Sequence, residues 1–218
     1  MSTADPAPEI AKVLLRRRLS TARATVSPAI RAAEAAALAT ALPAALSASA
    51  PFPASAASAA SAAPPPRSPG TVCAYWPVGT EPGSPALIDW LLRHGWRVLL
   101  PVVSPSGPLD WAQYTGAGSL RAGPLGLREP GGSRLGCAAI AGAAVVLVPA
   151  LAVDLHGVRL GRGGGHYDRT LPLATPGTPL VAVVRDDELL ARLPAQPHDV
   201  RVSAVLTPGA GWRPLPAP

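Results

Sequence analysis

The chain has 218 residues, of which 48% are hydrophobic and 15% charged, so it can bury a substantial core and is not a disordered protein. Its net charge of +6 favours anionic partners such as nucleotides. However, the chain also has 28 prolines, 21 glycines and a strong preference for arginine over lysine, so much of its basic character reflects a general bias in composition. The only lysine, Lys12, lies outside any GxxxxGK[ST] motif, which excludes a P-loop. The two cysteines form no CxxC pair, which argues against structural zinc and a disulfide framework.

Neither a membrane span nor a secretory leader is expected. Pro, Ser or Arg interrupts every apolar stretch before it reaches the ~20 residues that a span needs. Residues 1–10 contain two acids and no basic residue, unlike a signal peptide. The composition therefore predicts a reduced, cytoplasmic protein without a membrane partner.

Two helices are expected in the first 42 residues. The segment 8–19 has apolar residues at helical spacing, at Ile10, Val13 and Leu14. A second helix begins with Ser27 as N-cap and Pro28 as first helical residue, and runs to residue 42. Residues 43–70 are rich in Ala, Ser and Pro, which predicts a surface insertion or linker.

From residue 71 onward, short apolar runs alternate with turns or helices. The expected strands are 71–76, 96–103, 109–114, 144–151, 180–185 and 201–207, and the expected helices are 84–94, 165–171 and 186–193. This alternation predicts an α/β fold, in which a mostly parallel sheet lies between helices as a three-layer α/β/α domain. Ligands in such folds bind at the carboxyl ends of the strands.

The chain thus divides into four parts. Residues 1–42 form N-terminal helices that belong to the catalytic domain, residues 43–70 form the insertion, residues 71–210 form the α/β catalytic domain, and residues 211–218 form a C-terminal tail.

The segment VDLHGVRLGRGGGHYDR, residues 153–169, leaves a buried strand and enters a helix. Its glycines let main-chain N–H groups converge on an anion, and Arg159, Arg162 and Arg169 add guanidinium donors for phosphate oxygens. Asp168 lies where a carboxylate can hold Mg²⁺ against those phosphates. The alternative is a flexible turn that is rich in arginine because the whole chain is, but the strand–helix context favours a phosphate site.

The stretch HGVRLGRGGGHYDR within this segment resembles the signature loop of 5-formyltetrahydrofolate cyclo-ligases, also called methenyltetrahydrofolate synthetases. The resemblance covers most of the chain. Its other segments are KVLLR at 12–16, YWPVGTEPGSPALIDWL at 75–91, LP at 100–101, LDWAQY at 109–114, GLREP at 126–130, VPALAVD at 148–154 and HDVRVSAVLT at 198–207. We therefore expect the fold and the chemistry of that family.

The resemblance implies a monomeric, cytoplasmic ligase that uses ATP and Mg²⁺ to convert 5-formyltetrahydrofolate, with or without a polyglutamate tail, into 5,10-methenyltetrahydrofolate. The N5-formyl group is an amide and a poor electrophile. Phosphorylation of its oxygen gives an iminium phosphate, which the N10 amine attacks as phosphate leaves. ATP and the folate are the expected partners, and no nucleic acid is expected.

The resemblance also implies the roles of individual residues. The expected catalytic residues are Arg162 and Asp168, and the expected metal ligands are Asp168 and Asp199. The expected ATP-binding residues are Lys12, Arg16, Arg159, Leu160, Gly161, Arg162, Gly163, Gly164, Gly165, His166 and Tyr167. The expected folate-binding residues are Glu81, Trp111, Tyr114 and Tyr167.

Each of these assignments has a plainer alternative. A lysine and an arginine four residues apart, as at Lys12 and Arg16, usually mark a solvated helix face. Trp111 and Tyr114 are more often core residues, and Asp199 would otherwise be a turn residue. The chain also departs from the family pattern at three places: His166, Ser203 and the pair 143–144.

Three other functions are compatible with parts of the sequence. A phosphosugar isomerase or an acyl-CoA-transferase-like enzyme could use the glycine loop for a phosphate, but would not need Asp168 and Asp199 for Mg²⁺. A nucleic-acid binder would explain the charge, yet the chain has no RNP pattern and no basic stripe. A serine hydrolase is disfavoured because no GxSxG motif is present.

Overall fold

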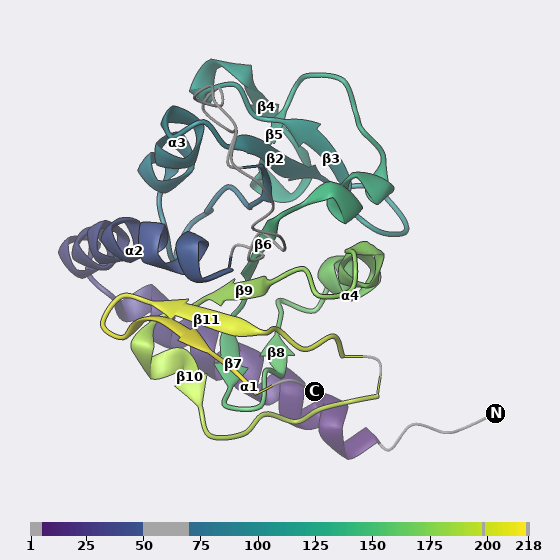
Figure 1. The fold of residues 1–218 in the computed structure, drawn as a ribbon. Coiled ribbons are helices and arrows are strands. Elements are labelled where there is room, and N and C mark those ends of the chain that lie inside the picture. Colours follow the sequence, from purple (N-terminus) through teal and green to yellow (C-terminus); the bar gives the residue numbers. More distant parts are fainter. Residues whose placement is uncertain (1–5, 50–69, 198, 217–218) are drawn as a thin grey trace, which may run out of the picture.

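The computed structural model describes residues 6–49, 70–197 and 199–216, and its centre is a seven-stranded sheet (Figure 1). The strand order is β12-β11-β9-β6-β1-β2-β3. The strands are β1 (Thr71–Cys73), β2 (Arg97–Val102), β3 (Asp110–Gln113), β6 (Val145–Pro149), β9 (Leu180–Val183), β11 (Ala204–Thr207) and β12 (Gly211–Pro214). The inner strands are mutually parallel, and only β3 and β12 at the two edges are antiparallel. The prediction of an α/β fold with a mostly parallel sheet is confirmed.

Both faces of this sheet are buried, because successive strand residues point to opposite sides. On one face, α2 (Pro28–Ser49) and α3 (Pro85–Arg93) pack on residues such as Val72 and Leu147. On the other face, Cys73 and Val146 pack against the 3₁₀ helix η3 (Cys137–Gly142) and the region of α4 (His166–Thr170) and η4 (Leu171–Leu173). In Figure 1, α2 and α3 lie on one side of the sheet and α4 lies on the other.

Smaller elements complete the fold. A three-stranded sheet, β10-β7-β8, consists of β7 (Ala152–Asp154), β8 (Arg159–Leu160) and β10 (Leu189–Leu190), and α1 (Pro6–Thr25) packs on it through Leu19. A hairpin joins β4 (Leu120–Ala122) and β5 (Arg128–Pro130). Short 3₁₀ turns are η1 (Ala117–Ser119), η2 (Pro124–Gly126) and η5 (Asp186–Glu188).

Several element boundaries differ from the sequence-based expectation. The helix predicted over 186–193 is instead η5 followed by β10, because its leucines pair with β7 and pack on it. The predicted tail contains β12, which pairs with β11. Helix α2 continues past residue 42 to Ser49, although it contains Pro43, because Leu42, Ala45 and Leu46 are buried in the core. The rest of the predicted insertion, residues 50–69, lies outside the described residues.

Helix α2 is more apolar than the sequence analysis assumed when it expected no membrane span. Its window Pro28–Leu46 is long and apolar enough to cross a membrane by length and composition, although Arg31 interrupts it. The same window packs on β11, β12 and α3, and Leu38 and Leu42 are completely buried there. Core helices of globular proteins pass the same test, so the window is weak evidence for a span.

Candidate active site

A cavity of about 530 Å³ opens at the carboxyl ends of the parallel strands β1, β2 and β6. Its walls come from α1, from the segment after β1, from the ends of β2 and β6, and from the glycine loop between β8 and α4. This is the edge at which α/β proteins bind their ligands. The lining includes Lys12, Arg16, Glu81, Arg159, Leu160, Gly161, Arg162, Gly163, Gly164, Gly165, His166, Tyr167, Asp168 and Asp199.

The glycine loop, residues 161–165, has a backbone that other residues would strain. Gly163 and Gly165 have φ values of +102° and +65°, in the left-handed region that favours glycine. A Cβ on Gly161 would lie 2.8 Å from Nη1 of Arg159, and a Cβ on Gly165 would lie 2.7 Å from Nη1 of Arg169. The glycines therefore leave main-chain atoms at the cavity surface, where N–H groups can donate to an anion.

Arg159 is a buried cation at the base of this loop. Its Nη2 donates to Oδ1 of Asp168 over 2.5 Å, and its guanidinium carbon lies 5.7 Å from the centre of the Tyr167 ring. Nε of Arg159 and the hydroxyl of Tyr167 are buried, and neither has a hydrogen-bond partner among the described residues. Unpartnered polar atoms next to a cavity are costly by themselves, and a bound ligand can satisfy them.

Arg162 and Glu81 connect two loops across the cavity. Nε of Arg162 lies 3.1 Å from Oε1 of Glu81, and the Arg162 side chain is 56% exposed whereas that of Glu81 is only 11% exposed. Burial raises the pKa of Glu81, while the N–H of Val78, the charge of Arg162 and the charge of Arg23 act in the opposite direction. The Arg162 side chain is largely exposed and so has room to turn toward a phosphate, but that movement breaks its ion pair with the buried carboxylate of Glu81.

Helix α1 brings two cations to the same cavity. Nζ of Lys12 donates to both carboxylate oxygens of Asp199, at 2.8 and 3.0 Å, and to Oε1 of Gln196 at 3.0 Å. Nε of Arg16 donates to the carbonyl oxygen of Gly161 over 3.1 Å, which ties the helix to the glycine loop. Lys12 is buried, so the alternative of a solvated helix face is wrong for this residue.

The structure does not place Trp111 and Tyr114, the predicted aromatic wall for the folate, at this cavity. Both are fully buried in the core, and neither lines the cavity. The Tyr114 hydroxyl donates to Oδ1 of Asp89 on α3. Trp76 does line the cavity, together with Tyr75 and Tyr167, and its ring lies 5.7 Å from that of Tyr114.

Arg169, which the sequence predicts to donate to phosphate oxygens, does not line the cavity and supports the glycine loop from outside. Its Nε donates to the carbonyl oxygen of Gly107 and its Nη2 to that of Gly164. His166 does line the cavity, and its Nδ1 lies 3.4 Å from Nη2 of Arg169.

Sequence reasoning missed several residues of the cavity wall. Tyr75 and Trp76 follow β1 directly, and their position after an inner strand was the signal that could have identified them. Gln196 had no such signal, because it lies in an irregular segment whose path the sequence does not specify, and Arg128 begins the short strand β5, whose position relative to the cavity the sequence does not specify either.

The family model for the 5-formyltetrahydrofolate cyclo-ligase family matches residues 9–208 of the chain. The chain belongs to this family. Two curated relatives are named 5-formyltetrahydrofolate cyclo-ligase. The protein from Mycolicibacterium smegmatis is 56% identical over 146 residues, which are 65% of this chain and 75% of the relative. The protein from Escherichia coli K12 is 34% identical over 145 residues, which are 65% of this chain and 80% of the relative.

Solved structures resemble the fold of this cyclo-ligase. The 5,10-methenyltetrahydrofolate synthetase of Aquifex aeolicus has a TM-score of 0.70 at 24% identity, over 95% of this chain and 94% of that chain. The corresponding protein of Mycoplasma pneumoniae has a TM-score of 0.62 at 18% identity, over 89% and 96% of the two chains. At these identities the likeness concerns the fold alone.

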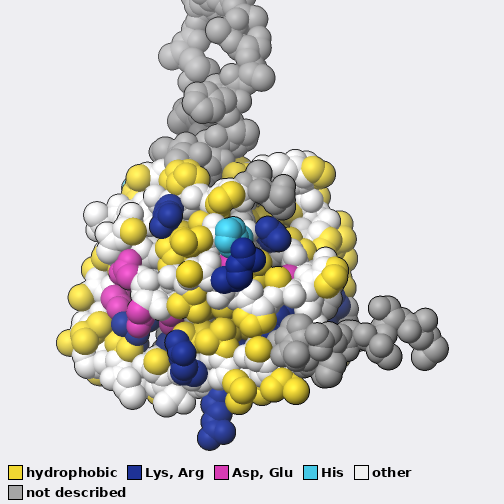
Figure 2. Space-filling model, turned by 90° about the horizontal axis from the view of Figure 1, so that it is seen from below, with side chains coloured by type: hydrophobic (Ala, Val, Ile, Leu, Met, Phe, Trp, Pro, Cys, Tyr) yellow, Lys and Arg dark blue, Asp and Glu magenta, His cyan; other side chains and the backbone are white. Residues whose placement is uncertain are grey.

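Membership of the family favours the ligase over the isomerase, the transferase and the nucleic-acid binder. On the face in Figure 2, basic side chains are scattered among hydrophobic ones and do not form a continuous stripe. A nucleic-acid binder normally gathers its basic side chains into such a stripe or patch.

Proposed function

We propose that this cyclo-ligase uses ATP to close 5-formyltetrahydrofolate to 5,10-methenyltetrahydrofolate, with release of ADP and phosphate. The observation that carries the proposal is the meeting, in one cavity, of the glycine loop, the cations Lys12, Arg16 and Arg159, and the buried carboxylate Glu81. The loop and the cations suit a triphosphate, and Glu81 suits the N–H groups of a pterin ring. The names of the two curated relatives support the reaction.

The reaction needs a phosphate donor because the formyl group is an amide. The formyl oxygen forms a bond to the γ-phosphorus of ATP while the bond from that phosphorus to ADP breaks. N10 then attacks the activated carbon and loses its proton. The bond between carbon and the former formyl oxygen breaks last, and this oxygen leaves as part of phosphate.

The residues of the phosphate side position and neutralise the nucleotide. Main-chain N–H groups of the glycine loop and the guanidinium of Arg162 contact the β- and γ-phosphates, and Arg16 and Lys12 approach from α1. Arg159 holds Asp168 and offers its unpartnered Nε. The resulting field stabilises charge on the transferred phosphoryl group.

The residues of the folate side orient the formyl group. Glu81 accepts from the pterin and Trp76 offers an aromatic surface, while Tyr167, whose buried hydroxyl has no partner among the described residues, lines the same cavity. The ion pair of Glu81 with Arg162 places these two groups next to each other before either substrate binds.

Asp168 fits a magnesium site of the kind found with nucleotides, where one or two carboxylates and the phosphate oxygens share the ion. Its side chain is 34% exposed at the cavity. Asp199 fits less well, because both of its oxygens accept from Lys12 and Oδ2 also accepts from the N–H of Gln196, whereas Arg159 donates to Oδ1 of Asp168. No group of three or more His, Cys, Asp or Glu in the described residues is arranged to hold a metal. Bound Mg²⁺ would neutralise charge on the phosphates, with Asp168 as its protein ligand.

We further propose that the enzyme acts as a monomer in the cytoplasm. Both cysteines are free thiols, which suits a reducing compartment. Burial raises the pKa of Cys73 to about 12, so this thiol stays protonated at neutral pH.

An absorbance assay tests the proposed reaction. The purified protein, Mg-ATP and 5-formyltetrahydrofolate should generate the methenyl chromophore, and omission of ATP should abolish it. Asp168→Ala should lower turnover by roughly 10²-fold or more while the protein stays folded. Asp187→Ala, which removes an exposed carboxylate on η5, is the matched control and should retain activity. A wild-type protein that produces no chromophore would contradict the proposal.

A further inference from the structure

Helix α1 packs on the rest of the protein through a face that is mostly charged, and its apolar residues are largely exposed. Its buried or half-buried side chains include Lys12, Arg16, Leu19 and Arg23, which are spaced by four, three and four residues and lie on one side of the helix. Its exposed residues include Ile10, Val13 and Leu14, which are 60%, 54% and 63% exposed. Polar contacts therefore contribute much of the specificity with which α1 is placed.

Arg23 has the most enclosed of these contacts. Its side chain is 2% exposed, and its Nε and Nη2 donate to the two oxygens of Glu188 over 2.6 and 2.7 Å. Nη2 also donates to the carbonyl oxygen of Ala150 over 2.6 Å. Ala150 directly follows β6 and lines the cavity, so Arg23 joins α1 to the strand end at which the site is built.

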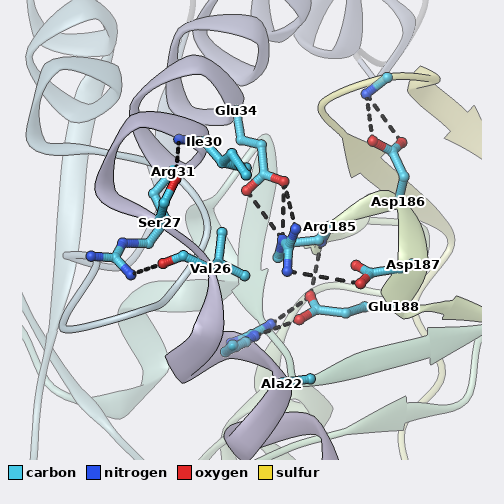
Figure 3. A network of polar contacts seen from close by, with 12 residues as sticks. Ala22, Val26, Ser27, Ile30, Arg31, Glu34, Arg185, Asp186, Asp187 and Glu188 are labelled. Atoms are coloured by element: carbon cyan, nitrogen blue, oxygen red, sulfur yellow. Dashed lines mark hydrogen bonds and ion pairs between the residues drawn. The ribbon is translucent and has the colours of Figure 1, made fainter.

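The partner of Arg23 is itself held in place. Oε2 of Glu188 accepts the main-chain N–H of Arg185, at the point where the chain leaves β9 and enters η5. The guanidinium of Arg185 in turn donates to both oxygens of Glu34 on α2. Figure 3 shows Glu34, Arg185 and Glu188 as successive members of this network. Arg23 is thus anchored to the ends of two adjacent sheet strands, β6 and β9.

A planar guanidinium with two parallel bonds to a carboxylate fixes direction as well as distance. Along a helix with a rise of 1.5 Å per residue, Arg23 lies about 10 Å from Arg16 and about 16 Å from Lys12. A small rotation or shift of α1 at Arg23 therefore moves both cations relative to the glycine loop. Displacements of about 1 Å at a reacting centre can cost 10²-fold in rate.

We propose that Arg23 is a positioning residue for the nucleotide half of the site. It sets the depth and rotation of α1, and through the helix it places Lys12 and Arg16 beside the glycine loop. Arg23 does not line the cavity and acts through these two residues. The inference rests on the proposed function, which identifies the nucleotide as ATP. It predicts that Arg23, although it lies outside the cavity, affects the binding of ATP and not that of the folate.

The test uses Arg23→Lys, which keeps the charge and removes the two-pronged contact with Glu188. The expected result is a five- to twentyfold rise in the KM for ATP, with the KM for 5-formyltetrahydrofolate changed by less than twofold. Arg185→Met is the matched control, because it breaks the ion pair with Glu34 but leaves α1 and the main-chain N–H at 185 in place. It should lower the melting temperature and leave both KM values within twofold of the wild type.

Direct binding separates this inference from the proposed reaction. The dissociation constant of a non-hydrolysable ATP analogue, measured by calorimetry below the melting temperature of each variant, should rise in Arg23→Lys and stay unchanged in Arg185→Met. This readout does not require turnover, so it holds even if the wild type fails the absorbance assay. If Arg23→Lys shifts the two substrates equally, or shifts neither, Arg23 is only a structural residue and the inference is overturned. If Arg23→Lys does not fold, Glu188→Gln weakens the contact with Arg23 together with the bond from the N–H of Arg185, and the dissociation constant of the ATP analogue should again rise while the KM for the folate changes by less than twofold.

Discussion

Helices α1 and α3 both pack against the body of this cyclo-ligase, but they do so by opposite means. Helix α3 begins at the N-cap Ser84, whose hydroxyl accepts the N–H of Leu87, and it buries Leu87, Ile88 and Leu91. Helix α1 exposes three large apolar residues and buries a lysine and an arginine. The difference follows from the surfaces beneath them, since α3 covers the apolar face of the sheet whereas α1 borders the cavity that contains the glycine loop. Under the proposed function, the inward cations of α1 serve the phosphate groups of ATP.

The largest effect is expected from Lys12→Met on α1. The substitution breaks the buried ion pair between Lys12 and Asp199, and we expect the free energy of unfolding to fall by about 3 kcal/mol. The KM for ATP should rise by roughly 10²-fold, because a charge at the phosphate end of the cavity is lost. Urea denaturation and steady-state kinetics measure the two effects. An unchanged KM for ATP would show that α1 does not serve the nucleotide.

Leu91→Ala on α3 provides the contrasting case. Leu91 is completely buried, so its truncation should lower the free energy of unfolding by about 2–4 kcal/mol. Both KM values, measured at a temperature where the variant is folded, should remain within twofold of the wild type. A selective change in the KM for ATP would mean that the two helices do not divide their roles as described.

Arg162→Ala should change the pH dependence of catalysis. Burial raises the pKa of Glu81 and the charge of Arg162 partly opposes this rise, so removal of Arg162 should raise the pKa further. Under the proposal that Glu81 accepts from the pterin as a carboxylate, kcat/KM for the folate should begin to fall at a higher pH on acidification than in the wild type. The KM for ATP should also rise by about tenfold. The control variant Glu81→Gln has no titrating carboxyl at this position, so its kcat/KM for the folate should no longer show this fall at acidic pH.

The smallest effect is expected on the exposed side of α1. Leu14 is 63% exposed, so Leu14→Gln should change the free energy of unfolding by no more than about 0.5 kcal/mol and leave the kinetics unaltered. A large loss of stability in this variant would show that the apolar side of α1 is covered in solution, and thermal unfolding would reveal it.

The parts of the molecule that sequence reasoning predicted well are those with a strong local signal. Buried strands such as 145–149 have continuous apolar runs, and the glycine loop lies between a strand and a helix, so both could be placed without a structure. The orientation of α1 could not be predicted in this way. The spacing of Ile10, Val13 and Leu14 indicates a helix, but only the position of the cavity determines which side of the helix faces inward.

The aromatic residues illustrate a second limit. Trp111 and Tyr114 have the alternating pattern of a strand, and this pattern does not distinguish a core position from a cavity wall. Their burial depends on η3 and α3, which pack over them from distant parts of the sequence. Trp76 lines the cavity because it directly follows β1, and the position of a residue relative to a strand end was the more informative feature.

The central claim is that the cavity brings the formyl oxygen of the folate to the terminal phosphoryl group of ATP. Its most direct test uses 5-formyltetrahydrofolate with ¹⁸O in the formyl group, followed by mass spectrometry of the released phosphate. If the formyl oxygen is phosphorylated and leaves as described, one ¹⁸O atom should appear in each inorganic phosphate formed. Unlabelled phosphate formed together with the methenyl product would contradict the account.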